Sequence, residues 1–239
     1  MKSYQRIYHE IEEAILAGRY QPESFLPSEN QLSTQYDVSR DTVRKALASL
    51  VANGYIQKIR GKGSIVIQRK QLRFPLSGLT SYHELQRAYG YDSTTEVVSL
   101  EKAIISPELA ESSGFSVGED VWKTVRIRKI DGQKVILDKD LLLVKYIPEL
   151  TEENLTHSLY HYIESDLKLA IAYAEKEITI DNLTPEDHLL DLHENDINIV
   201  SVKSRVYLAD AAQFQYTESR HQVDKFRFFD FARRNPSVY

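Results

Sequence analysis

Two groups of cationic side chains in this sequence have the spacing needed to bind anions. In the first group Arg40 and Arg44 are four residues apart, so a helix would place them one turn apart on the same face. An arginine near the start of an exposed helix can form two hydrogen bonds with the major-groove edge of guanine. We therefore predict that Arg40, Thr42 and Arg44 read bases, whereas Lys45 lies farther round and contacts phosphate.

A second basic motif follows at Arg60-Gly61-Lys62-Gly63. Glycine allows the main chain to approach DNA closely, and the two cations provide charge for a minor-groove or phosphate contact. Serine and threonine hydroxyls at the helix starts add short polar groups. The predicted DNA-binding residues are Ser28, Ser39, Arg40, Thr42, Arg44, Lys45, Arg60, Gly61, Lys62 and Gly63. The alternative is an ordinary solvated helix face, which a lone basic helix would favour.

The other group of cations lies near the middle of the chain. Arg126 and Arg128 alternate with apolar residues in a β-type run, so both guanidinium groups point to one side of a strand. Polar residues on other predicted strands are Asp138, Asp140, Tyr216, Glu218 and Arg220. Such a set suits a phosphorylated sugar, because cations bind phosphate and carboxylates bind sugar hydroxyls. The alternative, equally supported by the pattern, is a ladder of arginine–aspartate pairs across neighbouring strands.

The first group requires a helix-turn-helix to position it. Ser28 and Gln31 form a capping-box pattern that starts one helix, and Ser39 starts the next. On that second helix the apolar residues at helical spacing are Val43, Ala46, Leu47 and Leu50. An amphipathic run over residues 4–17 predicts a supporting helix, and β-type runs at 55–59 and 64–67 predict a hairpin around the glycine motif. These elements together predict a winged helix.

The second group requires a sheet. Strands are predicted at about 96–105, 121–130, 134–144, 174–180, 198–208 and 213–225, with Asp131-Gly132 as a hairpin turn. Helices are predicted at about 81–89, 107–113, 157–167 and 185–192. This order indicates an α+β protein with an N-terminal winged helix in residues 1–69, a linker at 70–79 and an antiparallel-sheet domain at 80–239.

Charge is unevenly distributed along the chain. The net charge is −5, but residues 1–71 hold 11 basic and 7 acidic residues, giving +4, and the remainder carries −9. We call residues 1–71 the head and the remainder the body. A basic head on an acidic body directs phosphate contact to the head. Because the chain has no cysteine, disulfides and thiolate metal sites are excluded. We expect a cytoplasmic protein, since neither a signal peptide nor a membrane-spanning run is recognisable.

Several motifs resemble known regulators. The N-terminal part resembles the DNA-binding domain of GntR-type bacterial repressors at Leu26-Pro27-Ser28-Glu29, from Val38 to Leu47, at Gly54-Tyr55-Ile56 and at Arg60-Gly61-Lys62-Gly63. The remainder resembles the UTRA-type effector domain of the HutC branch, whose fold is similar to chorismate lyase. That resemblance is carried by residues 74–79, by Arg126 and Arg128, and by residues 216–221. Residues 136–140 and 218–234 look most similar to repressors of trehalose operons.

The resemblance implies a homodimeric transcriptional repressor that binds double-stranded operator DNA. A dimer is expected because one recognition helix reads only a few bases. The implied effector is a sugar phosphate such as trehalose 6-phosphate, and no cofactor is implied. Carried over residue by residue, its pocket would contain Thr95, Arg126, Arg128, Asp138, Ser158, Tyr160, Tyr207, Glu218 and Arg220. Some relatives have a basic residue directly after the position of Thr95, where this chain has Glu96.

Two other functions remain open at this point. One is a regulator of the same branch that senses a different ligand, such as an amino-sugar phosphate. The other is an enzyme of chorismate-lyase type tethered to DNA. The sequence shows no Ser-His-Asp arrangement, phosphate loop or paired catalytic carboxylates, so no catalytic residue is predicted. His157 and His161 have helical spacing but no further ligands nearby, which indicates a polar helix face rather than a metal site.

Overall fold

The computed structural model describes residues 3–67, 93–226 and 228. They belong to two compact units, one N-terminal and one C-terminal, which are described separately below. The predicted linker at 70–79, the predicted helix at 81–89 and the predicted domain bounds between residues 69 and 80 lie outside the described residues. Within the described ranges, no helix is long and apolar enough to cross a membrane.

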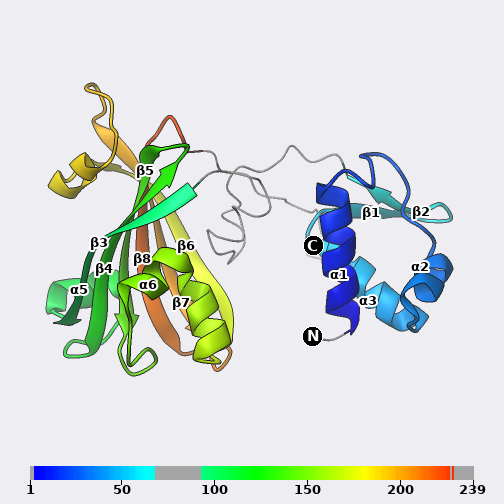
Figure 1. Ribbon diagram of the computed structural model, residues 1–239, viewed down its shortest axis with the longest axis horizontal. Coiled ribbons are helices and arrows are strands. Elements are labelled where there is room, and N and C mark those ends of the chain that lie inside the picture. The colour runs from blue at the N-terminus through cyan, green and yellow to red at the C-terminus, as the bar shows by residue number, and fades with distance from the viewer. Residues whose placement is uncertain (1–2, 68–92, 227, 229–239) are drawn as a thin grey trace, which may run out of the picture. The chain divides into compact units, whose positions relative to one another are not determined.

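The N-terminal unit is built on three helices (Figure 1), α1 (Ser3–Leu16), α2 (Glu29–Tyr36) and α3 (Arg40–Ala52). Its core joins α1 to α3 through the fully buried side chains of Ile7, Ile11, Val43 and Leu50. The capping box predicted at Ser28 is confirmed. Asp37 ends α2 in the left-handed conformation, with φ of 50°, and this sharp turn leads directly to α3.

A two-stranded hairpin completes this unit. Strands β1 (Ile56–Ile59) and β2 (Gly63–Val66) pair in antiparallel fashion, with Ile59 opposite Gly63. The loop between them needs its glycines, because Gly61 and Gly63 have φ of +77° and +115°. Arg60 and Lys62 are exposed in this loop. The predicted winged helix is therefore confirmed.

The C-terminal unit is a six-stranded antiparallel sheet of order β3-β4-β5-β8-β7-β6. Its strands are β3 (Ser93–Ile104), β4 (Asp120–Ile130), β5 (Gln133–Leu143), β6 (Ile171–Asn182), β7 (Asn198–Leu208) and β8 (Gln213–His221). The predicted turn between β4 and β5 is confirmed, since Asp131 and Gly132 both have positive φ.

Helical segments cover both faces of this sheet (Figure 1). We call face A the side that carries Arg126 and Arg128, and face B the side that carries Val125 and Ile127. On face A lie α6 (Glu152–His157), α7 (Leu159–His161) and the π-helical turn η1 (Tyr162–Asp166), whose Leu155, Leu159 and Ile163 pack on Leu142. On face B lie α5 (Pro107–Ser113) and the 3₁₀ turn η2 (Pro185–Leu189).

The helix predicted at about 157–167 is present as α7 and η1, which together run from Leu159 to Asp166, whereas α6 was not predicted. The structure has α6 before this segment and a break at Ser158, whose backbone is extended with φ of −161°. The Ser158 hydroxyl accepts a hydrogen bond from the N–H of His161, so it starts a new helix instead of continuing the old one. Strand β8 also ends at His221, earlier than predicted, because the N–H of Lys225 bonds back to Gln222 in a turn.

Candidate DNA-binding surface and effector site

Helix α3 has one buried side and one cationic side. Val43, Ala46, Leu47 and Leu50 are buried, whereas Arg40, Arg44 and Lys45 are exposed, as the spacing predicted. The Ser39 hydroxyl caps this helix by accepting the N–H of Thr42 at 3.3 Å, and it lies 2.9 Å from the Thr42 hydroxyl. These two hydroxyls therefore shape the helix start, and they are not simply free contacts for phosphate.

Two exposed cations of this unit, Arg44 and Lys58, are joined by the carboxylate of Glu29. Glu29 Oε2 accepts a hydrogen bond from Arg44 Nε at 2.8 Å, and Glu29 Oε1 accepts one from Lys58 Nζ at 3.1 Å. Arg44 Nη1 is also 3.5 Å from Asp41 Oδ1. The hydrogen bond from Arg44 lowers the pKa of Glu29, although burial opposes this. Lys58 was not predicted to take part, because it precedes the basic loop motif.

In the C-terminal unit the core of face A is a buried network around Arg126. Arg126 donates to Asp140 Oδ2 from Nη2 at 2.6 Å and from Nε at 3.2 Å. The Thr124 hydroxyl donates to the same oxygen at 3.1 Å, and Gln215 Nε2 donates to Asp140 Oδ1 at 2.8 Å. Because all four residues are less than 5% exposed, this carboxylate is held almost without water. The arrangement meets the requirement that a buried charge be paired and hydrogen-bonded.

A second ion pair on face A lies closer to solvent. Arg128 Nε donates to Asp138 Oδ2 at 2.6 Å, and Arg128 Nη1 donates to the Thr95 hydroxyl at 3.2 Å. Ser219 donates to the other Asp138 oxygen at 2.5 Å. The side chain of Arg128 is 15% exposed, against 5% for Arg126. Of the two arginines, Arg128 is thus the more accessible to solvent.

Electrostatics keeps these groups charged. Burial opposes ionisation of Asp138, but the charges of Arg128 and Arg126 outweigh it and lower the pKa of this carboxyl to about 2. Burial and the charge of Asp140 raise the pKa of Tyr160, so its phenol is a neutral hydrogen-bonding group at neutral pH. Tyr160 lies on α7, which places a phenol over this part of face A. Face A thus offers cations, carboxylates, hydroxyls and a phenol.

The alternative interpretation, in which arginines pair with aspartates across neighbouring strands, is therefore partly correct. Arg126 and Arg128 do pair with aspartates of the neighbouring strand, β5. The pairs are buried, however, and do not form the surface ladder that the alternative envisaged. The attraction within a buried ion pair is largely offset by the free energy of removing both charges from water. The presence of these pairs is therefore weak evidence for a purely structural role.

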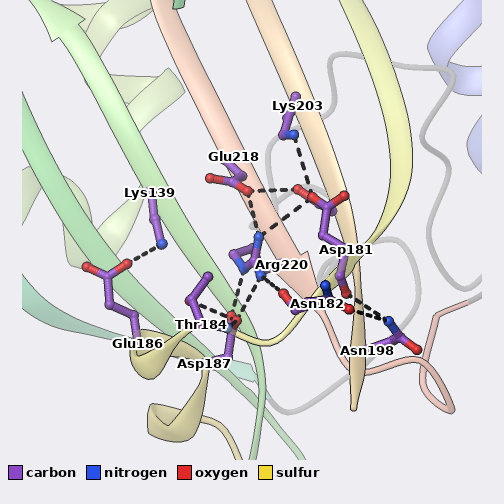
Figure 2. Close-up of polar contacts among 11 residues, drawn as sticks. Lys139, Asp181, Asn182, Thr184, Glu186, Asp187, Asn198, Lys203, Glu218 and Arg220 are labelled. Carbon is purple, nitrogen blue, oxygen red and sulfur yellow. Dashed lines mark hydrogen bonds and ion pairs between the residues drawn. The ribbon is translucent and has the colours of Figure 1, made fainter. Parts of the chain in front are cut away.

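The structure places Glu218 and Arg220 apart from most of the predicted effector set. In the β5–β8 register Asp138 is opposite Ser219, so the neighbours Glu218 and Arg220 point to face B. Figure 2 shows Arg220 there, where it donates to both Asp187 oxygens at 2.7 and 2.8 Å. It also donates to Glu218 at 2.8 Å. Arg220 therefore fixes the η2 turn to strand β8 and is 3% exposed.

The two remaining members of the predicted set also differ from expectation. Tyr207 lies on face B, where its ring stacks on Tyr173 at 4.6 Å and its hydroxyl donates to Glu175 at 3.1 Å. Ser158 is the cap of α7, two residues before Tyr160. The structure thus brings together Thr95, Arg126, Arg128, Asp138 and Tyr160 on one side of the sheet, and it separates Tyr207, Glu218 and Arg220 from them.

Four polar residues of face A were absent from the predicted effector set, namely Thr124, Asp140, Gln215 and Ser219. Strand alternation was the signal for two of them, since Thr124 shares the parity of Arg126, and Asp140 shares that of Asp138. Gln215 and Ser219 required the register of β8 against β5, which the sequence does not give. Among the described residues, no group of three or more potential ligands could hold a metal ion.

Comparison with known proteins separates the same two units. Residues 3–66 match the family model described as bacterial regulatory proteins, gntR family, and residues 88–227 match the UTRA domain. The chain is 49% identical to the HTH-type transcriptional regulator TreR of Bacillus subtilis over 229 residues, covering 95% of this chain and 96% of the relative.

Solved structures agree with this match. The structure of possible transcriptional regulator YydK from Bacillus subtilis is similar with a TM-score of 0.81 and 27% identity, covering 98% of this chain and all of that one. The effector-binding domain of the Bacillus subtilis trehalose repressor has a TM-score of 0.54 and 44% identity. It covers 59% of this chain and 99% of that one. The relatives that match over nearly the whole chain are transcriptional regulators, not enzymes.

Proposed function

Because this chain belongs to the GntR family of bacterial transcriptional regulators and carries a UTRA effector domain, we propose that it represses a trehalose-utilisation operon and is released from its operator by trehalose 6-phosphate. In this proposal the protein acts in the cytoplasm as a homodimer on twofold operator DNA. The effector is a ligand and no cofactor is needed. We choose trehalose because this chain is similar to a solved domain that is described as the effector-binding domain of a trehalose repressor.

The observation that carries the proposal is the polar network of face A. A phosphorylated disaccharide presents a dianion and many hydroxyls, and face A presents two guanidinium groups, two carboxylates and the Tyr160 phenol. A guanidinium group binds phosphate through two parallel hydrogen bonds. Since Arg128 is the more exposed arginine, we assign the phosphate to Arg128 and Thr95.

Arg126 has a different role in this proposal. Its donors already hold Asp140, which in turn is fixed by Thr124 and Gln215. Such a buried hydrogen-bonded network holds its members in one geometry, although Gln215 Oε1 has no partner among the described residues. We infer that Arg126 fixes the floor of the site and keeps Asp138 charged, and that carboxylate and phenol oxygens then bind sugar hydroxyls.

The head reads the operator through α3 and through the hairpin of β1 and β2, which we call the wing. Arg40, Thr42 and Arg44 would contact base edges, while Lys45, Arg60 and Lys62 would contact phosphates. Release follows from linkage: an effector that binds the DNA-incompetent arrangement of a dimer more tightly must lower operator affinity. The factor by which operator affinity falls cannot exceed the ratio of the effector's affinities for the two arrangements.

A competition experiment tests the proposed effector. The operator would first be obtained by selecting bound duplexes from a random library, and its release would then be followed by fluorescence anisotropy. Trehalose 6-phosphate should release it at concentrations at least tenfold below trehalose, glucose 6-phosphate and glucosamine 6-phosphate. Release by glucosamine 6-phosphate alone would replace trehalose by an amino sugar as the sensed ligand. A complex that none of the four compounds releases would contradict the proposal.

A further inference from the structure

We propose that Glu29 is a positioning residue for operator recognition, which holds Arg44 of the recognition helix and Lys58 of the wing in the geometry that meets DNA. Glu29 is the first residue of α2, Arg44 lies on α3 and Lys58 lies on β1. One carboxylate therefore joins three elements of the head. This inference depends on the DNA-reading role of Arg44.

The geometry of the contact leaves the arginine usable. Glu29 Oε2 accepts a hydrogen bond from Arg44 Nε at 2.8 Å, so the carboxylate binds the nitrogen of the guanidinium group that is nearest the side-chain stem. Of the terminal nitrogens, Nη1 lies 3.5 Å from the exposed carboxylate of Asp41, and the Arg44 side chain remains 52% exposed. A guanidinium group reads guanine through two donors in a planar fork. Fixing Nε sets the plane of that fork before DNA arrives.

The second oxygen of Glu29 extends the same control to the wing. It accepts Lys58 Nζ at 3.1 Å, and Lys58 lies on the strand that leads into the exposed loop with Arg60 and Lys62. The wing is otherwise joined to the helices mainly through the buried apolar residues Ile56 and Val66. The carboxylate thus adds a polar link between the part that reads bases and the part that contacts phosphate.

Glu29 places a negative charge beside the cations proposed to contact DNA, where its electrostatic effect on DNA binding should be unfavourable. A carboxylate repels phosphate, so removing one from a basic head ordinarily strengthens binding to any DNA. Hydrogen bonding by Arg44 lowers the pKa of Glu29, which keeps it ionised at neutral pH against the opposing effect of burial. Long side chains lose rotamer freedom on binding, and holding Arg44 in advance reduces that loss. If Glu29 positions Arg44, removing Glu29 should weaken recognition of the operator. If Glu29 is only a negative charge, removing it should strengthen binding to DNA.

A base-by-base binding experiment on the full-length protein separates the possible roles. Arg40→Ala and Arg44→Ala first identify the operator base pair that each arginine discriminates. Glu29→Ala should then lose discrimination at the Arg44 base pair by at least tenfold and keep it at the Arg40 base pair. Binding to random-sequence duplex should stay equal or become tighter. Glu29→Gln keeps one acceptor for Arg44 Nε and should retain part of the discrimination.

Glu13→Gln provides the control for charge. Glu13 is an exposed acid on α1, and its loss should raise affinity for operator and random duplex alike, with their ratio unchanged. If Glu29→Ala behaves in the same way, Glu29 only repels DNA and the inference is overturned. Equal loss at both base pairs in Glu29→Ala and Glu29→Gln would also overturn it, because that pattern marks a general role in folding. If Arg44→Ala changes no base preference, the reading role of Arg44 fails first.

Discussion

At the scale of single residues, Arg126 is a buried charge on which the stability of the effector domain depends. Its guanidinium group is buried with Asp140, and the two lie 2.6 Å apart. Removing one partner of such a pair leaves the other charge buried and unpaired, which typically costs about 3–5 kcal/mol. The same change at an exposed pair is worth less than about 1 kcal/mol.

We therefore predict that Arg126→Ala lowers the free energy of unfolding of the effector domain by about 3–5 kcal/mol. Trp122 is the single tryptophan of the chain and lies on β4, so its fluorescence in urea reports on this domain alone. Lys123→Ala, which breaks the exposed pair with Glu101, is the matched control. Equal effects of the two substitutions would show that Arg126 is not buried in an ion pair.

His221 makes the stability of this domain depend on pH. Burial lowers its pKa to about 4 from 6.5, a shift that Arg128 supports and Asp138 opposes. Between these two values the unfolded chain binds a proton that the folded chain does not. Stability is therefore fully present above pH 6.5 and falls as the pH drops towards 4.

Urea unfolding of parent and His221→Gln between pH 4 and 7 measures this dependence. The parent should lose stability relative to the variant on acidification, by at most about 1.4 kcal/mol per pH unit. Asp138 loses its contribution only at lower pH, between its ordinary pKa of 3.8 and about 2, so the two windows separate. A parent and a variant with parallel pH profiles would show that His221 is not buried in its neutral form.

At the scale of elements, the register of strand β8 decides which of its side chains lie on face A beside Asp138. Ser219 lies opposite Asp138 and donates to it, whereas Glu218 points to the other face towards Lys203 and Ser201. The polar pattern of the strands and the family resemblance both placed Glu218 in the predicted site. A shift of one residue along a strand moves a side chain to the opposite face, so a carried-over alignment must be correct to the residue.

This alternation gives a direct prediction for two neighbouring residues. Ser219→Ala should weaken the response to effector several-fold, because it removes the donor that orients Asp138. Glu218→Gln is nearly isosteric, lies on face B and should leave the response unchanged. Operator release measured by anisotropy against trehalose 6-phosphate distinguishes them. A loss confined to Glu218→Gln would place the effector on face B.

The elements themselves were predictable wherever local chemistry determines them. The capping box at Ser28, the positive-φ turn at Asp131-Gly132 and the buried spacing of α3 follow from short-range sequence patterns, and the structure confirms all three. Helix α6 was missed, because its six residues are too few for a helical period to be recognised.

The candidate site was only half predictable for a related reason. Period-two alternation correctly put Arg126 and Arg128 on one side, because that needs one strand only. The contacts with Gln215 and Ser219 depend on pairing between β5 and β8, which are separated by some 70 residues of chain. The link from Glu29 to Arg44 and Lys58 likewise joins separate elements, and no local pattern reports it.

At the scale of the whole molecule, sensing and DNA binding are divided between the two units. The head holds the basic surface of α3 and the wing, and the acidic C-terminal unit holds the buried arginines of face A. Coupling between them is reciprocal: an effector that weakens operator binding by a given factor must itself bind the operator complex more weakly by that factor. A ligand site in one unit and a DNA site in the other must therefore respond to each other.

The measurement that tests this account most directly is the operator dissociation constant with and without saturating trehalose 6-phosphate, in the parent and in Arg128→Gln. We predict a rise of at least tenfold for the parent, little change for Arg128→Gln, and equal operator affinity of both without effector. Lys203→Gln on face B is the control and should respond like the parent. If Arg128→Gln is released as readily as the parent, with its Trp122 fluorescence unchanged, the effector does not bind at face A.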